Sequence, residues 1–192
     1  NYTLSEKDKL AGIESGAEVN TVNSVNTQTG DVVLPVLEGT QYIYVQADGT
    51  DTENATELQN AYNTAKTMSP SATNRITVVA GIGNYDFGTS SFDMDTEYID
   101  LVSLDGNRSV VFNHTLNTSD RAEGSIYITA NDVFVKGVDV GDKKFNIENN
   151  LNLLKVENCK GGNESFGYEV DALGTFTNCE GGSSSFGGDG GT

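Results

Sequence analysis

One stretch decides the fold: Asn158-Cys-Lys-Gly-Gly-Asn-Glu-Ser-Phe-Gly167 returns twenty residues later as Asn178-Cys-Glu-Gly-Gly-Ser-Ser-Ser-Phe-Gly187. A period of about twenty residues is too long for a helical heptad and too short for a globular domain. It matches one coil of a β-solenoid, in which each coil buries its apolar face against its neighbours. The repeat therefore predicts a stack of coils. The sequence stops soon after the second copy, so we expect the array to be cut short there.

A shared pattern extends the repeat towards the N-terminus. Four segments that begin at Val111, Val135, Val156 and Phe176 read apolar, any residue, Asn or Gly, then a mostly apolar residue, at spacings of 24, 21 and 20. Asn and Gly accept a left-handed conformation at a tight corner, and stacked Asn amides hydrogen-bond along the stack. We therefore predict a structural ladder of Asn113, Gly137, Asn158 and Asn178, flanked by Cys159 with Cys179 and by Phe166 with Phe186.

The two cysteines occupy the same position in the two copies of the repeat, and the sequence has no others. Neighbouring parallel strands lie about 4.8 Å apart, so a Cys159–Cys179 disulfide is conceivable on distance alone. Equivalent Cβ vectors point the same way, however, which fits stacked side chains better. We expect buried thiols that behave as small hydrophobes, and two cysteines are too few for a zinc site.

The remaining sequence is typical of a mainly β protein with one good helix. Strands are expected at 41–46, 76–79, 98–102, 110–112, 125–128, 132–135 and 153–156. Apolar residues at helical spacing predict a helix over about 54–68, with Asn54 and Glu57 as its capping box and Pro70 beyond its end. Such a helix ahead of a solenoid is the expected device for covering the first coil. No second long helix follows, which argues against a doubly wound fold.

Residues 1–38 form a separate predicted connector. Ser5 can cap a short helix within residues 1–20, and Val22–Leu34 reads as two short strands around a Thr29-Gly-Asp turn. Neither piece has an apolar core of its own. This region is therefore expected to need partner chains, whereas 39–192 holds the solenoid, with regular 20-residue coils from about residue 150.

Charge and hydropathy exclude several classes of partner. The formal net charge is −17 and the pI is near 4.1, which argues against nucleic acid and against an anionic membrane surface. No apolar run approaches the roughly 20 residues that span a bilayer, so we expect no membrane insertion. The sequence begins with Asn and lacks a secretory signal, and we read it as a fragment of a longer protein.

The N-terminal segments resemble parts of bacteriophage tail fibres. Leu4–Asn20 (LSEKDKLAGIESGAEVN) is similar to a short linker repeated in many such fibres. Val22–Leu34 (VNSVNTQTGDVVL) is similar to a fibre segment that typically reads VNSVNGQTGxVxL, with Thr27 in place of the usual Gly. Residues 41–192 resemble the right-handed parallel β-helix of pectin-lyase-like tailspikes. Ile76–Gly88 resembles their usual first coil, and the Val-x-Asn-Cys corners resemble their asparagine ladder.

This resemblance implies a homotrimer, with 1–38 as a trimeric neck joined to other tail or baseplate proteins of the virion. It implies a structural and adhesive role in the virion tail, with the distal part meeting a host glycan or an outer-membrane protein. The alternative is a tailspike-type polysaccharide depolymerase, a lyase or a glycosidase. A bacterial surface adhesin unconnected to a phage is a third interpretation, which the fibre-like N-terminal segments disfavour.

Candidate catalytic groups have plain structural explanations, so we predict no enzyme activity, metal or cofactor. On a strand, Asp93 and Asp95 would lie about 6.5 Å apart, within the range that glycosidases use. We favour a solvated acidic loop for them and their neighbours Glu97 and Asp100, and the same explanation for Asp139 with Asp142. Position alone makes Lys136, Lys143, Lys144 and Lys155 candidates for a lyase base.

Other polar and aromatic residues were weighed in the same way. Asp48–Glu53 offers oxygen ligands for calcium without the spacing of an EF-hand, and a turn is favoured. His114 stands alone and is read as a stacking or surface residue. Tyr127, Phe134, Phe166, Tyr168 and Phe186 are candidates for stacking on sugars. Tyr168 has no aromatic equivalent in the next copy of the repeat, where Gly188 stands, and is therefore the possible glycan contact.

Overall fold

The computed structural model describes residues 40–113, 125–148, 151–166, 173–183 and 185–186, together with Thr3, Ser5 and two short N-terminal strands. The chain divides into two compact units, Asn1–Leu37 and Glu38–Thr192. In the first unit, β1 (Ser24–Val25) pairs with β2 (Gln28–Thr29) in antiparallel register. The second strand predicted around the Thr29-Gly-Asp turn lies outside the described residues. The helix predicted within residues 1–20 lies outside the described residues.

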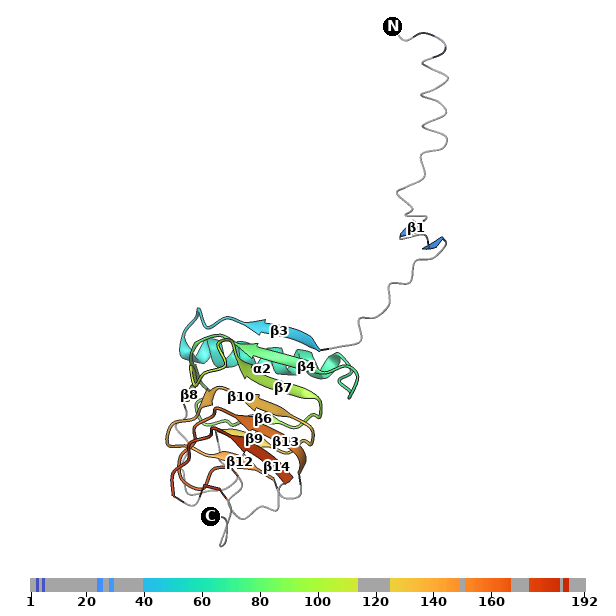
Figure 1. Cartoon of the computed structure of the whole chain (residues 1–192). Helices are drawn as coiled ribbons and strands as arrows, with labels where there is room; N and C mark the ends of the chain where they lie inside the picture. The colour runs from blue at the N-terminus through green and yellow to red at the C-terminus, as the bar shows by residue number, and fades with distance from the viewer. Residues whose placement is uncertain are drawn as a thin grey trace. The chain divides into compact units, whose positions relative to one another are not determined.

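Three all-parallel sheets build the second unit (Figure 1). The largest has the strand order β14-β13-β10-β7-β4-β3. Its strands are β3 (Gln41–Val45), β4 (Ile76–Ala80), β7 (Ile99–Ser103), β10 (Phe134–Lys136), β13 (Asn152–Glu157) and β14 (Leu173–Thr177). The second sheet holds β5 (Gly83–Asp86), β8 (Val110–Asn113) and β11 (Val138–Asp139), and the third holds β6 (Phe92–Met94), β9 (Ile126–Ile128) and β12 (Phe145–Ile147).

The chain visits the three sheets in turn. The circuit β4-β5-β6 is followed by β7-β8-β9 and then by β10-β11-β12, and every strand pairs with its equivalent in the next circuit. This stacking is a parallel β-helix-like arrangement, and it confirms the prediction of a mainly β chain with one helix among the described residues. The sequence showed the strands of the large sheet more clearly because several of the others have only two to four residues.

One inward-facing column fixes the register of the large sheet. Val78 pairs with Leu101, Leu101 with Val135, Val135 with Val156, and Val156 with Phe176. The first four side chains are fully buried. Because side chains alternate between the two faces of a strand, a slip by one residue would turn this whole column outward. Burial therefore holds the coils in register.

Helix α2 (Asp51–Thr67) begins three residues earlier than predicted. Its N-cap is Thr50, whose Oγ1 accepts a hydrogen bond from Glu53 N at 3.3 Å, while Glu53 Oε2 accepts one from Thr50 N at 2.8 Å. Thr50-x-x-Glu53 and Asn54-x-x-Glu57 both match a capping box, and the sequence pattern does not rank them. Asn54 is buried in the helix and donates to Asn84 O at 3.0 Å. The helix ends before Ser69, which has a φ of 54°, and Pro70.

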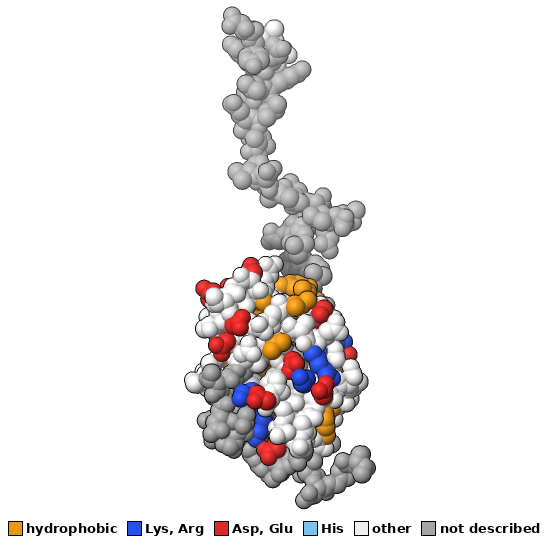
Figure 2. Space-filling model, turned by 90° about the vertical axis from the view of Figure 1, so that its left-hand side faces the viewer, with side chains coloured by type: hydrophobic (Ala, Val, Ile, Leu, Met, Phe, Trp, Pro, Cys, Tyr) orange, Lys and Arg blue, Asp and Glu red, His pale blue; other side chains and the backbone are white. Residues whose placement is uncertain are grey.

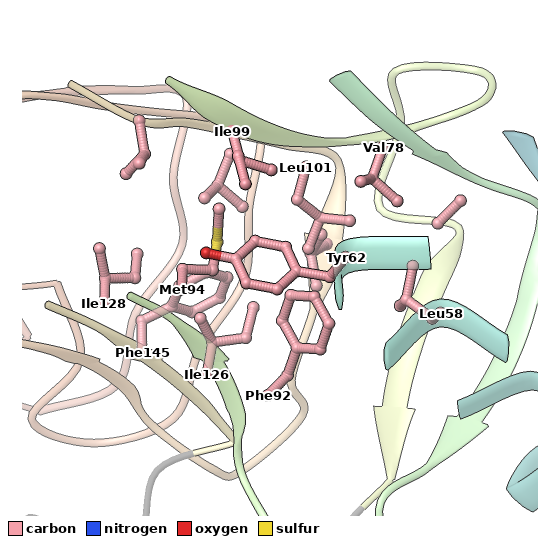
Figure 3. Close-up of a cluster of buried hydrophobic side chains, with 14 of the residues drawn as sticks. Leu58, Tyr62, Val78, Phe92, Met94, Ile99, Leu101, Ile126, Ile128 and Phe145 are labelled. Carbon is pink, nitrogen blue, oxygen red and sulfur yellow. The ribbon is translucent and has the colours of Figure 1, made fainter. Parts of the chain in front are cut away.

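The apolar side of α2 packs into the interior of the stack (Figure 3). Leu58 and Tyr62 are fully buried, and the Tyr62 ring meets Phe92 edge-on with 5.3 Å between the ring centroids. The Tyr62 hydroxyl accepts a hydrogen bond from Thr96 N at 3.2 Å and donates to Asp95 Oδ1 at 3.4 Å. Burial raises the pKa of Tyr62 above its usual range. The helix thus shields the apolar interior of the first coil.

No helix among the described residues is long and apolar enough to cross a bilayer.

Candidate functional site

The corners that follow β10, β13 and β14 carry the predicted Gly and Asn residues. Gly137, Asn158 and Asn178 have φ values of 76°, 53° and 53°, which only glycine and short polar residues adopt readily. Asn178 Nδ2 donates a hydrogen bond to Asn158 Oδ1 at 3.0 Å. The side chains of two successive coils are therefore linked along the stack at this corner.

Gly137, Asn158 and Asn178 form a row along the stack, which we call the corner row. Asn113 is not part of the corner row, so the alignment predicted from the sequence was wrong at this position. Val135 pairs with Leu101 of β7, whereas Asn113 pairs with Asp86 of β5 in the second sheet. The residue that precedes Gly137 in the row is therefore Ser103. The prediction failed because Val111-Phe112-Asn113 matches the corner pattern but lies on a different sheet of the same circuit. The residues that do align, Ser103 and Gly137, are separated in sequence by the whole circuit from β7 to β10.

A loop over residues 104–109 covers the corner row at Gly137. Asn158 Nδ2 donates to Gly106 O at 2.8 Å, and Ser103 Oγ donates to Asn107 O at 2.7 Å. A Cβ atom added to Gly137 would overlap Ser103 Oγ and Asn107 O. The loop backbone therefore occupies the space that a side chain at Gly137 would need. The Gly106 carbonyl accepts the hydrogen bond from Asn158 that an Asn side chain at position 137 would otherwise accept.

Asp105 organises this loop. Its Oδ1 accepts hydrogen bonds from Ser109 Oγ at 2.5 Å and from Asn107 N at 2.9 Å. These bonds, the one from Ser109 first, lower the pKa of Asp105 below its usual value. The charged carboxylate therefore holds the turn in the shape that presents the carbonyl of Gly106 to Asn158.

Ion pairs link different coils of the stack. Arg108 Nη1 lies 2.5 Å from Glu180 Oε2, and its Nη2 donates to Asn178 O at 2.9 Å, so the 104–109 loop reaches the last described coil. Lys136 pairs with Glu157 and Lys144 with Glu164, both at 2.6 Å. Figure 2 shows basic and acidic side chains lying against one another on one face. Arg108 and Lys136 are partly exposed, and surface ion pairs contribute about 0–1 kcal/mol each, whereas Lys144 is buried.

The Cys159 and Cys179 thiols are free. Cys159 is fully buried, and its Sγ donates to Glu157 O at 3.3 Å. Burial raises the pKa of Cys159 to about 12. Cys179 is half-buried, and its pKa is raised by the same cause.

Phenylalanine rings form a stack beside the corner row. Phe166 lies between Phe145 and Phe186, with centroid distances of 4.7 and 5.2 Å and stacked ring planes. Phe176 of β14 pairs in register with Val156 of β13. Sequence reasoning missed Phe145, although its spacing of 21 residues to Phe166 nearly repeats the 20 residues between Phe166 and Phe186.

The candidate carboxylates each have their own partner. Asp93 lies in β6 and accepts from Ser91 Oγ at 2.5 Å, whereas Asp95 follows that strand and lies 2.7 Å from Lys66 Nζ. Asp100 is buried and forms a bidentate ion pair with Arg75. The Nη1 atom of Arg75 donates a hydrogen bond to Asp132. The other predicted acids are likewise engaged, Glu97 by Asn131, Asp139 by Gly141 N and Lys160, and Asp142 by Lys143.

The candidate lysines are also paired. Lys155 Nζ lies 3.7 Å from Glu157 and 4.8 Å from the centre of the Phe134 ring, and Lys143 lies 3.5 Å from Asp142. Among the described residues, no group of three or more His, Cys, Asp or Glu side chains is arranged to hold a metal ion. Of the proposed calcium ligands, Glu53 caps α2.

The other aromatic and imidazole candidates differ in their surroundings. Tyr127 and Phe134 are half-buried on β9 and β10, Phe166 is buried, and Phe186 is exposed. His114 and Tyr168 lie outside the described residues, and so does the possible glycan contact assigned to Tyr168.

A groove of about 340 Å³ lies between α2 and the turn after β5. It is lined by Thr52, Ala55, Thr56, Gln59 and Asn60 of the helix and by Asp86, Phe87, Gly88, Ser90 and Ser91 of the turn. The lining of the groove is mainly apolar, with a few hydroxyl, amide and carboxylate groups beside one aromatic ring, which is the usual composition of a ligand site. Sequence reasoning missed this groove because its two walls come from separate elements that only folding brings together.

No family model, no curated protein and no solved structure matches this chain.

Proposed function

We propose that this chain is a structural and adhesive part of a phage tail fibre, built on a right-handed parallel β-helix that α2 caps. The observation that carries the proposal is the in-register stacking of coils, with Asn178 bonded to Asn158 and Asn158 to the Gly106 carbonyl. A stack whose strands, corners and outer ion pairs all bond from coil to coil resists bending. It is therefore suited to transmit force along a shaft.

Adhesion would come from side chains that the stack displays outward. Tyr42 and Tyr44 of β3 are 57% and 67% exposed, and their rings stack with 6.2 Å between centroids. The groove beside α2, with its mainly apolar lining and a few polar groups, offers a second contact surface for a host glycan or an outer-membrane protein. Three copies joined through residues 1–38 would present each surface three times, and weak contacts then sum through avidity.

The absolute mass in solution tests the trimeric fibre. We would measure light scattering on a size-exclusion column for residues 1–192 and for a variant that lacks residues 1–38. The proposal predicts a trimer for the whole sequence and a monomer for the variant. A monomer in both cases would contradict the proposal of a trimeric fibre.

Incubation with purified host capsule or lipopolysaccharide tests the adhesive role against the enzymatic alternative. The proposal predicts binding without a change in polysaccharide length. Cleavage would favour a depolymerase instead. The pairing of Asp95 with Lys66 and of Asp100 with Arg75 supports the adhesive assignment, because ion-paired carboxylates are poorly placed to act as general acids.

A further inference from the structure

The two copies of the repeat share the corner conformation at Asn158 and Asn178 but differ in burial. Phe166 is 1% exposed and Phe186 is 45% exposed. Cys159 is fully buried, whereas Cys179 is half-buried. Asn158 and Asn178 have the same φ of 53°. The corner conformation is therefore the same in both copies, while the surroundings that cover each copy differ.

The second copy is what covers the first. The Phe186 ring lies on Phe166 with an interplanar angle of 10°, and Asn178 bonds to Asn158. Backbone bonds run from Glu180 N to Cys159 O at 2.9 Å and from Gly182 N to Gly162 O at 3.0 Å. Like residue therefore lies on like residue, twenty positions apart.

The second copy presents the same groups on its other side. Among the described residues, β14 is the last strand of the six-stranded sheet and no strand pairs with its other edge. Among the residues that the structure describes, no donor reaches Asn178 Oδ1, the atom equivalent to the acceptor on Asn158. An unpaired strand edge, an amide acceptor and an exposed ring thus repeat, in position and chemistry, the surface that the first copy offers to the second.

We propose that the β14 side of the stack is a docking surface for one further coil of the same repeat. The occupant carries an Asn in register with Asn178 and an aromatic ring in register with Phe186, in the pattern Asn-Cys-x-Gly-Gly-x-x-Ser-Phe-Gly. The proposal stands on the stack alone and does not depend on the fibre assignment.

An extended chain tests this surface. Residues 1–187 would be followed by another copy of residues 168–187, which keeps the period of twenty. The readout is the rate at which a thiol reagent modifies Cys179, with Cys159 as the internal reference. Because a thiol reacts through its accessible thiolate, covering Cys179 should slow its modification by at least about tenfold, towards the rate of Cys159. The thiol in the added copy is replaced by Ser so that it does not contribute.

A matched extension controls for length and composition. In it, the added equivalents of Asn178 and Phe186 are replaced by Ala and Ser, and Cys179 should react as fast as in the unextended chain. Amide hydrogen exchange of β14 gives a second readout, because a docked coil should protect the amides of Phe176 and Asn178, which alternate with the amides that face β13.

Three results would overturn the proposal. Unchanged Cys179 reactivity and β14 exchange in the extended chain would show that the added coil does not dock. Faster modification of both cysteines would show that the extension disrupts the stack. Equal protection by the matched control would show that the Asn and aromatic positions do not direct docking.

Discussion

The two ends of the stack solve the same problem differently. At the β3 end, α2 lays Leu58 and Tyr62 into the interior, and both side chains are fully buried. At the β14 end, Phe186 stacks on the interior column and is 45% exposed. A solenoid buries apolar surface only between coils, so its outermost coils need a different element or another coil. Helix α2 covers the interior at the β3 end, whereas the β14 coil presents a surface similar to that of the coil on which it stacks.

The corner row shows the same contrast. Above Gly137, the 104–109 loop brings backbone carbonyls to Asn158 and Ser103. Below, Asn178 donates to Asn158 and offers its own Oδ1 outward. The lesson is that a ladder of amides can be ended by backbone as well as by side chains.

The largest effect is expected at the covered end. Tyr62→Ala should lower the free energy of unfolding by about 3–5 kcal/mol, because it removes a fully buried ring and leaves a cavity. The control is Asn60→Ala on the exposed side of the same helix, which should stay within about 0.5 kcal/mol of the parent. Urea unfolding of each variant measures the difference. Equal losses would mean that α2 does not close the interior through Tyr62.

The loop that closes the row is tested by Gly137→Ala. The new Cβ would displace the 104–109 loop and would also occupy a left-handed backbone, for a total cost of about 2–4 kcal/mol. Gly141→Ala is the matched control, because Gly141 has a φ of 64° but nothing within 4 Å of an added Cβ. It should carry only the backbone cost, about 1–2 kcal/mol. A pair of variants with the same stability would contradict the crowding at Gly137.

The two asparagines compare the inner and outer rungs of the row. Asn158→Ala removes one donor and one acceptor and leaves the Gly106 carbonyl and the Asn178 amide without these partners. Asn178→Ala removes a single rung. Both positions share a φ of 53°, so the backbone cost cancels, and Asn158→Ala should be the worse by about 1 kcal/mol. The opposite order in chemical denaturation would show that the bond to the loop contributes nothing.

The cysteines give the smallest effect and the simplest pH test. Near pH 8, a thiol reagent should modify Cys179 well before Cys159, whose pKa burial raises to about 12. Since the folded pKa of Cys159 lies above its unfolded value, its contribution to stability is complete below about pH 9 and declines as the pH rises towards 12. Cys159→Ser would separate this contribution from other alkaline effects. Modification of both thiols at one rate would contradict the difference in burial.

Sequence reasoning succeeded where residues repeat and failed where contacts are remote. The Phe166–Phe186 and Asn158–Asn178 pairs follow from one period, so their alignment needed no structure. The start of α2 was missed because Thr50 and Asn54 both satisfy the same capping pattern, and only burial of Asn54 separates them. Asn113 was misplaced because a short pattern does not say which of three sheets it belongs to. The groove beside α2 carries no sequence signal at all.

The spacing of identical residues was enough to predict that this protein stacks coils, because that spacing states which side chains can lie on one another. How the stack begins and how its corner row is closed depend on contacts between residues far apart in the sequence. A helix ends one side through a few buried side chains, and the 104–109 loop ends the row through backbone carbonyls. Every residue has a carbonyl group, so no residue type marks the ones that Asn158 and Ser103 use. Only the path of the chain brings them there.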